Sequence, residues 1–150
     1  MELIPSGPWL EITGRLVLAL ILGATVGLER ELRRSPAGLR TFTMLSLGAC
    51  VYMLVSLDTT RVDGVRGDPG RVAAQVVTGI GFLGGGVLFR AGESVRGLTT
   101  AAGLWASAAL GLAAGAGLYF IAIMGAVLML FVFHGLWLIE QRYETGEHLD

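Results

Sequence analysis

The sequence is poor in charge and in the residue types that build most soluble active sites. Charged residues make up 15% of its 150 positions, whereas an average soluble domain carries about a quarter. The net charge is −1, and without a basic excess the composition excludes an electrostatic footprint for nucleic acid. Cys50 is the single cysteine, so neither an internal disulfide nor a CxxC metal site can form.

Long apolar segments take the place of the missing charge. Hydrophobic residues make up 53% of the chain, and the mean hydropathy is +0.68. From Gly97 to Ile139 the chain runs for 43 residues without Asp, Glu, Lys or Arg. No soluble domain of this size has a core that needs such a run, so the sequence predicts a membrane protein.

The charged clusters divide the chain into segments that suit membrane spans, each of which needs about 20 apolar residues. The 43-residue run is twice that length, so we expect it to fold back at the glycine-rich segment 113–117, because glycine tolerates the φ values of a reversal. The predicted fold class is all-α, a multi-pass transmembrane helix bundle with about five spans at 9–28, 41–57, 72–89, 99–114 and 118–139. Residues 140–150 then form a short acidic cytoplasmic tail.

The distribution of arginine predicts the orientation, because basic residues in short loops stay on the cytoplasmic side. With five spans, the first loop, the third loop and the C-terminus share one side, which holds seven arginines against three on the other side. We therefore expect the N-terminus outside and the C-terminus in the cytoplasm. The start of the chain lacks the positive region of a secretory signal, so we expect the first apolar segment to be retained.

Small residues recur at helical spacing in three of the predicted spans. Helices in lipid associate through close backbone approach between small residues. The glycine-rich segment 79–86 has a second interpretation, a broken helix that lines an ion path, but packing is the commoner use of glycine. Replacement of Gly111 by Leu is expected to abolish contact with a partner while the protein still inserts. The predicted packing positions are Gly23, Gly27, Gly81, Gly85, Gly103, Ser107 and Gly111.

The residues do not support an enzymatic activity or a bound cofactor. No group of His, Cys, Asp and Glu has metal-ligand spacing, and no catalytic triad can be assembled. Glu11 and Arg15 are i,i+4 neighbours that can pair. His134 lies inside the fifth predicted span, where a packed or interfacial histidine is commoner than a proton relay. The remaining polar residues gather at predicted helix ends, where ordinary anchoring at the membrane surface accounts for them.

Four sequence motifs point to a known family. They are GLERE at 27–31, AGLRT at 37–41, DPGRVAAQVVTGIGFLG at 68–84 and VRGLTTAAGLW at 95–105. In this order, and within about residues 20–115, they resemble the MgtC/SapB family of membrane proteins.

The resemblance implies a multi-pass protein of the bacterial inner membrane, connected with adaptation to low magnesium. Some members support survival inside host cells. The best-studied members resemble regulators of other membrane proteins, including the F-type ATP synthase, and not magnesium pumps. Many members continue into a soluble cytoplasmic domain, whose functions we do not carry over to this sequence. The positions that match the motifs, and to which the resemblance implies a functional role, are Glu29, Arg30, Arg40, Thr41, Asp68, Arg71, Gln75, Arg96, Thr99 and Thr100.

Two functions fit the sequence, and the lipid bilayer is a partner in both. The first, which we favour, is a regulator that contacts other membrane proteins, or a second copy of itself, helix to helix. The second is a small transporter or channel for Mg²⁺ or another ion. Protein-bound Mg²⁺ usually has one or two carboxylates and several waters as ligands, and the predicted spans hold no carboxylate at mid-membrane.

Overall fold

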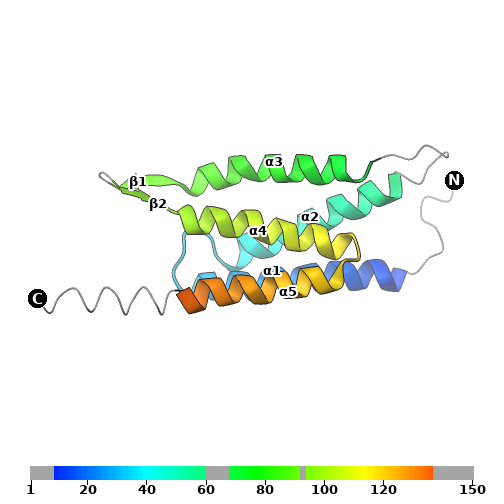
Figure 1. Cartoon of the computed structure of the whole chain (residues 1–150), viewed down its shortest axis with the longest axis horizontal. Coiled ribbons are helices and arrows are strands. Elements are labelled where there is room, and N and C mark those ends of the chain that lie inside the picture. Colours follow the sequence, from blue (N-terminus) through cyan, green and yellow to red (C-terminus); the bar gives the residue numbers. More distant parts are fainter. Residues whose placement is uncertain (1–8, 60–67, 92–93, 137–150) are drawn as a thin grey trace, which may run out of the picture.

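The chain folds into parallel and antiparallel helices that lie side by side (Figure 1). The computed structural model describes residues 9–59, 68–91 and 94–136. In these residues the helices are α1 (Trp9–Leu32), α2 (Leu39–Thr59), α3 (Gly70–Val87), α4 (Leu98–Gly115) and α5 (Tyr119–Phe131), which continues into the π-helical turn η2 (Val132–Leu136). Two three-residue strands, β1 (Phe89–Ala91) and β2 (Ser94–Arg96), join α3 to α4. The predicted all-α class is confirmed.

Each helix overlaps one predicted span. α1 continues to Leu32, beyond the predicted end at residue 28. α3 ends at Val87, and Phe89, which the prediction included in the third span, pairs with Arg96 in the antiparallel hairpin. The end of the fifth predicted span, 137–139, and the acidic tail at 140–150 lie outside the described residues.

Three of the described helices are long and apolar enough to cross a membrane, namely α1, α2 and α4. α5 and most of η2 form a further apolar segment, Tyr119–Gly135 in its described part, which is shorter than these three helices. These apolar helices fit the predicted membrane protein. Crossing of the membrane by α3 and α5 stays a prediction.

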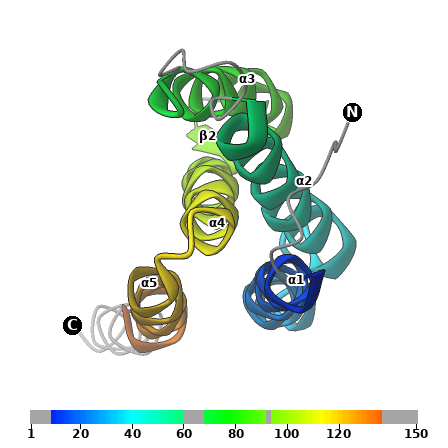
Figure 2. The ribbon, with the colours of Figure 1, turned by 90° about the vertical axis from the view of Figure 1, so that its right-hand side faces the viewer.

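α4 lies at the centre of the bundle and touches each of the other four described helices. In a view along the helices, α3 and α5 lie on opposite sides of α4, and α1 and α2 lie along a third side (Figure 2). Half of the residues of α4 are buried inside the chain, against 28% in the apolar windows of α1 and α2. The bundle is therefore organised around α4.

Small residues bring the helix backbones into direct contact. A Cβ added to Gly23 of α1 would lie 2.7 Å from the Ser46 Cβ, and one added to Gly115 of α4 would lie 2.7 Å from the Cys50 carbonyl oxygen. Side chains at these positions would push α2 away from both neighbours. Close approach of this kind is a main source of helix association in lipid, and the bundle packs through small-residue faces as predicted.

Two buried serines add hydrogen bonds between helices. The Ser46 hydroxyl of α2 donates to the Ala19 carbonyl of α1 at 2.8 Å, and the Ser107 hydroxyl of α4 donates to the Phe42 carbonyl of α2 at 3.2 Å. Both serines are fully buried. Each hydroxyl thus joins α2 to a different neighbour.

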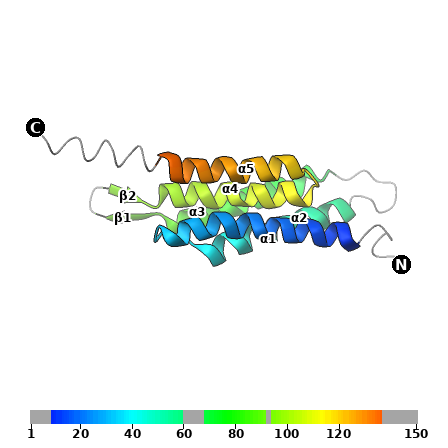
Figure 3. The same ribbon diagram turned by 90° about the horizontal axis from the view of Figure 1, so that it is seen from below.

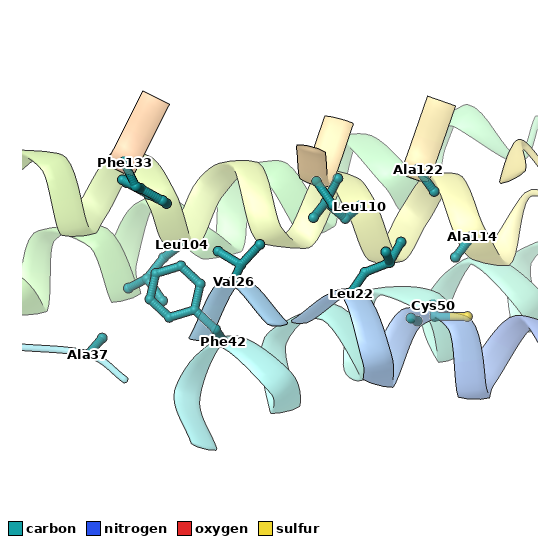
Figure 4. Close-up of a cluster of buried hydrophobic side chains, with 12 residues drawn as sticks. Leu22, Val26, Ala37, Phe42, Cys50, Leu104, Leu110, Ala114, Ala122 and Phe133 are labelled. Carbon is teal, nitrogen blue, oxygen red and sulfur yellow. The ribbon is translucent and has the colours of Figure 1, made fainter. Parts of the chain in front are cut away.

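An apolar cluster fills the space between α1, α2 and α4 (Figure 4). Phe42 of α2 is fully buried beside Val26 of α1 and Leu104 of α4. A Cβ on Gly103 would lie 2.7 Å from Cζ of Phe133 and 3.2 Å from Cζ of Phe42. Gly103 therefore leaves the room that two aromatic rings occupy.

Glycines with positive φ stand at both ends of α4. Gly97 (φ 94°) follows the hairpin, which extends beyond the helix ends (Figure 3), and Gly117 (φ 78°) lies between α4 and α5. Both values are strained for residues with a Cβ. The reversal predicted at 113–117 begins only at Ala116, because α4 continues through Gly115.

Candidate functional site

Charged residues gather where α1 and η2 end. We call this group the Arg30 cluster: Glu29 and Arg30 of α1, Arg33 in the turn after α1, and Phe133 and His134 of η2. Glu29 Oε1 accepts a hydrogen bond from Arg33 Nε at 3.2 Å, and Glu29 Oε2 lies 3.5 Å from Arg30 Nη1. The side chains of Glu29 and Arg30 are only 14% and 13% exposed. One carboxylate therefore pairs with two neighbouring guanidinium groups in a largely buried position, and the three side chains together keep a net positive charge.

The Arg30 cluster connects the first and last described helical segments. The Arg30 guanidinium lies over the Phe133 ring, 4.6 Å from its centroid, in a cation–π contact. Arg33 Nη2 donates to His134 Nδ1 at 2.9 Å. The two contacts tie the end of α1 and the turn after it to the π-helical turn, a type of turn that often occurs at functional sites.

The cluster keeps unused hydrogen-bonding capacity. Glu29 Oε2 and Arg30 Nε are buried and have no hydrogen-bond partner in the described structure. The described segments also hold no group of three or more His, Cys, Asp and Glu residues that could bind a metal ion. The chemistry available here is ionic and cation–π contact between helix ends.

The loop between α1 and α2 reinforces the same end of the bundle. Glu31 Oε2 accepts a hydrogen bond from the Leu39 amide at 3.0 Å, which places a carboxylate at the positive N-terminal end of α2. A Cβ on Gly38 would lie 2.8 Å from Cδ of Glu31, so glycine allows this contact. The hydroxyls of Ser35 and Thr100 are hydrogen-bonded at 2.8 Å, which joins the loop to α4.

The structure brings together three of the residues that the motifs single out. Glu29 and Arg30 are adjacent, and Thr100 reaches them through Ser35, whose amide donates to the Arg30 carbonyl at 3.0 Å. The other four motif residues at this end are exposed: Arg40, Thr41, Arg96 and Thr99. The motif residues here thus divide into a buried set and an exposed set.

Three further motif residues lie at the opposite end, where α3 begins. Asp68 Oδ1 accepts a hydrogen bond from the Gly70 amide at 2.8 Å, in the first turn of α3. Arg71 and Gln75 are exposed and line a groove between α2 and α3 with a volume of about 540 Å³. The two ends of the bundle therefore carry separate sets of motif residues.

The glycines predicted to pack the bundle occupy two kinds of place. Gly23, Gly27, Gly103 and Gly111 lie against neighbouring helices, and an added Cβ on Gly111 would overlap the Ser46 carbonyl oxygen. Gly81 and Gly85 of α3, by contrast, face open space, and an added Cβ there would meet no atom of the described chain within 4 Å.

Two long-range contacts of arginine side chains were not predicted from the sequence. Arg15 forms the expected ion pair with Glu11, but it also donates to the Gly115 carbonyl at 2.7 Å and so binds the C-terminal end of α4. The second is the contact between Arg33 and His134, 101 positions apart. Spacing along one helix reveals an i,i+4 pair, but it carries no information on a partner so far away.

Comparison with known proteins identifies relatives for most of the chain. The MgtC family profile matches residues 16–142. "Protein MgtC" of Salmonella typhimurium LT2 is 48% identical over 115 residues, which cover 77% of this chain and 48% of that protein. "Putative magnesium transporter YhiD" of Escherichia coli K12 is 44% identical over 129 residues, 81% of this chain and 60% of that protein.

A protein of Haemophilus influenzae is 45% identical over 125 residues, which cover 79% of this chain and 52% of that protein. The chain thus spans about half the length of the curated relatives it matches. Neither the name MgtC nor the name YhiD denotes an enzyme. No solved structure matches the chain.

Proposed function

Because the chain belongs to the MgtC family, we propose that it is a protein of the bacterial inner membrane that regulates other membrane proteins by helix–helix contact during adaptation to low magnesium. The F-type ATP synthase, which the family resemblance suggests, and a second copy of the chain are the partners to test first.

The open small-residue face of α3 carries this proposal. Ala74, Thr78, Gly81 and Gly85 follow one another at spacings of four, three and four residues, so they lie on one helix face. All four are exposed. The Thr78 hydroxyl donates to the Ala74 carbonyl of the same helix at 2.9 Å, so a partner helix meets a smooth surface with no polar group left to satisfy.

The distribution of arginine supports the proposed orientation. α1 begins and η2 ends at opposite ends of the bundle (Figure 1), as an odd number of crossings requires. The arginines Arg30, Arg33, Arg34, Arg40 and Arg96 belong to the end at which η2 finishes. We assign this end to the cytoplasm because short basic segments stay on that side.

The experiment compares two glycines that are both open in the described chain. Gly81→Leu adds a large side chain to the proposed contact face, and Gly14→Leu adds the same side chain to α1, where an added Cβ also meets nothing within 4 Å. Crosslinking in bacterial membranes, followed by identification of the captured proteins, should recover a partner about tenfold less with Gly81→Leu. Unchanged recovery with Gly81→Leu contradicts the proposal.

The structure also revises the substitution expected to test this idea. Gly111 lies inside the bundle against Ser46, so Gly111→Leu disturbs the fold and does not isolate a partner surface. Gly81 replaces it as the informative position.

Ion transport is the alternative, and the name of the Escherichia coli relative favours it. A hydrated route would pass the motif residues Asp68 and Gln75 at the start of α3. Purified protein in liposomes should then show a Mg²⁺ flux that Asp68→Ala abolishes. If the wild type shows no flux, the alternative is wrong and the regulator remains.

A further inference from the structure

The groove between α2 and α3 is not part of the contact face proposed above. It lies on the flank of α3 that faces α2, away from Gly81 and Gly85. Gly48 of α2 and Gly79 of α3 both line it, and an added Cβ on either would meet no described atom within 4 Å. The two glycines thus keep the space between the helices open.

The lining of the groove changes from polar to apolar along its length. Tyr52, Arg71 and Gln75 lie where α3 begins, and α3 lines the groove from Arg71 to Leu83. At 1.5 Å per residue this run is about 18 Å long, slightly more than half of a hydrocarbon core of about 30 Å. The rest of the lining is apolar or glycine: Met44, Leu45, Gly48, Ala49, Val72, Val76, Gly79, Ile80 and Leu83.

The polar end of the groove offers a positive charge. Among the described residues Arg71 takes part in no ion pair or side-chain hydrogen bond. Asp58 and Asp68 belong to the same end of the bundle, but neither lines the groove, and Asp68 Oδ1 accepts from the Gly70 amide. The guanidinium is therefore available to an anionic group that enters the groove from the membrane surface.

The charge at the polar end of the groove distinguishes between two occupants. An apolar transmembrane helix brings no anion to the Arg71 guanidinium, whereas a phospholipid brings a phosphate for the guanidinium and a thin acyl chain for the apolar lining. The groove therefore suits a phospholipid better than an apolar transmembrane helix.

We propose that this groove binds one membrane phospholipid from the leaflet in which α3 begins. Its phosphate pairs with the Arg71 guanidinium and accepts a hydrogen bond from the Gln75 amide. One acyl chain follows the apolar lining between α2 and α3, past Gly48 and Gly79, towards Leu83. Charge at one end and a full leaflet of apolar lining beyond it give the lipid a defined place, unlike the lipids that exchange freely around the bundle.

Native mass spectrometry of the whole chain, purified in mild detergent and supplied with phosphatidylglycerol, tests this proposal. Wild type should keep one phospholipid per chain. Gly79→Leu fills the groove and should lose this lipid. Arg71→Gln removes the charge and should lower its occupancy about tenfold, which corresponds to 1.4 kcal/mol. The matched control is Gly14→Leu, which adds the same side chain to an open position of α1 and should keep the lipid.

Circular dichroism checks that each variant stays helical. If the wild type binds no phospholipid, or if Gly79→Leu keeps as much as the wild type, the proposal is wrong. A lipid-free dimer that Gly79→Leu dissociates would also overturn it and would assign the groove to a second copy of the chain. Equal loss of lipid in Gly79→Leu and Gly14→Leu would show that the lipid is not bound in the groove.

Discussion

α3 and α4 are helices of equal length that are both rich in small residues, yet they have opposite roles in the bundle. Both have 18 residues, and glycine recurs in both. Nine residues of α4 are buried, but only two of α3 are, Ile80 and Gly84. Gly103, Gly111 and Gly115 of α4 meet atoms of other helices, whereas Gly81 and Gly85 of α3 meet none in the described chain.

A stripe of small residues therefore shows where another helix can pack closely, but not whether that helix belongs to the same chain or to a partner. In α4 the approach is satisfied inside the chain by α1, α2, α3 and α5. In α3 one flank packs on α4 and another faces α2, whereas the face with Gly81 and Gly85 stays open to the membrane or to a partner. The central helix thus serves stability, and the peripheral helix carries the surfaces available for function.

Replacement of one glycine by leucine in each helix should give the largest difference in stability between α4 and α3. Gly111→Leu should lower the free energy of unfolding by about 3 kcal/mol or more, because the side chain overlaps the Ser46 carbonyl and forces α2 and α4 apart. Gly81→Leu should change it by less than about 0.5 kcal/mol. Unfolding in detergent micelles measures both, and equal losses would contradict the comparison.

Two arginines at the same end extend the comparison from helix faces to helix ends. Arg30→Ala removes the cation–π contact with Phe133 and leaves the largely buried Glu29 with one partner fewer. We expect a loss of about 2 kcal/mol, since removing one partner of a largely buried charge is costly, although Glu29 keeps its hydrogen bond from Arg33. The control Arg40→Ala removes an exposed side chain and should cost less than about 0.5 kcal/mol. Similar losses in thermal unfolding would argue against a stabilising Arg30 cluster.

The smallest expected effect compares two hydroxyls. Ser107 of α4 bonds to the Phe42 carbonyl of another helix, whereas Thr78 of α3 bonds within its own helix. Ser107→Ala should cost about 0.6 kcal/mol, the average for hydrogen bonds between membrane helices, and at most about 1.7 kcal/mol. Thr78→Ala should leave the free energy of unfolding unchanged, because the Thr78 hydroxyl bonds only within α3. If the two variants unfold alike, the bond between Ser107 and Phe42 contributes nothing measurable.

Much of the fold was predictable because membrane helices follow simple rules of length and polarity. Charge-free runs predicted the helices, and four motifs predicted the family, which the comparisons confirm. The hairpin at Phe89–Arg96 was missed because its three-residue strands have neither the length nor the alternating pattern of an ordinary strand.

The candidate site was less accessible to sequence reasoning. Glu29, Arg30 and Thr100 stood out through their motifs, but their contacts with Ser35 and Phe133 depend on how α4 and η2 pack against α1. Gly81 and Gly111 both belong to small residues spaced by four, but only Gly111 lies against α2. Tertiary packing, not local preference, decides such cases.

The bond from Arg15 to the Gly115 carbonyl has a consequence for how the protein is made. The two residues are 100 positions apart, so α1 leaves the ribosome long before the end of α4 exists. An arginine inside a spanning helix costs about 2.5 to 3.5 kcal/mol at the centre of the helix, and until α4 arrives Glu11 is the neighbour that offsets part of this cost. The hydrogen bond that joins Arg15 to the end of α4 can therefore form only after the fourth helix has been synthesised.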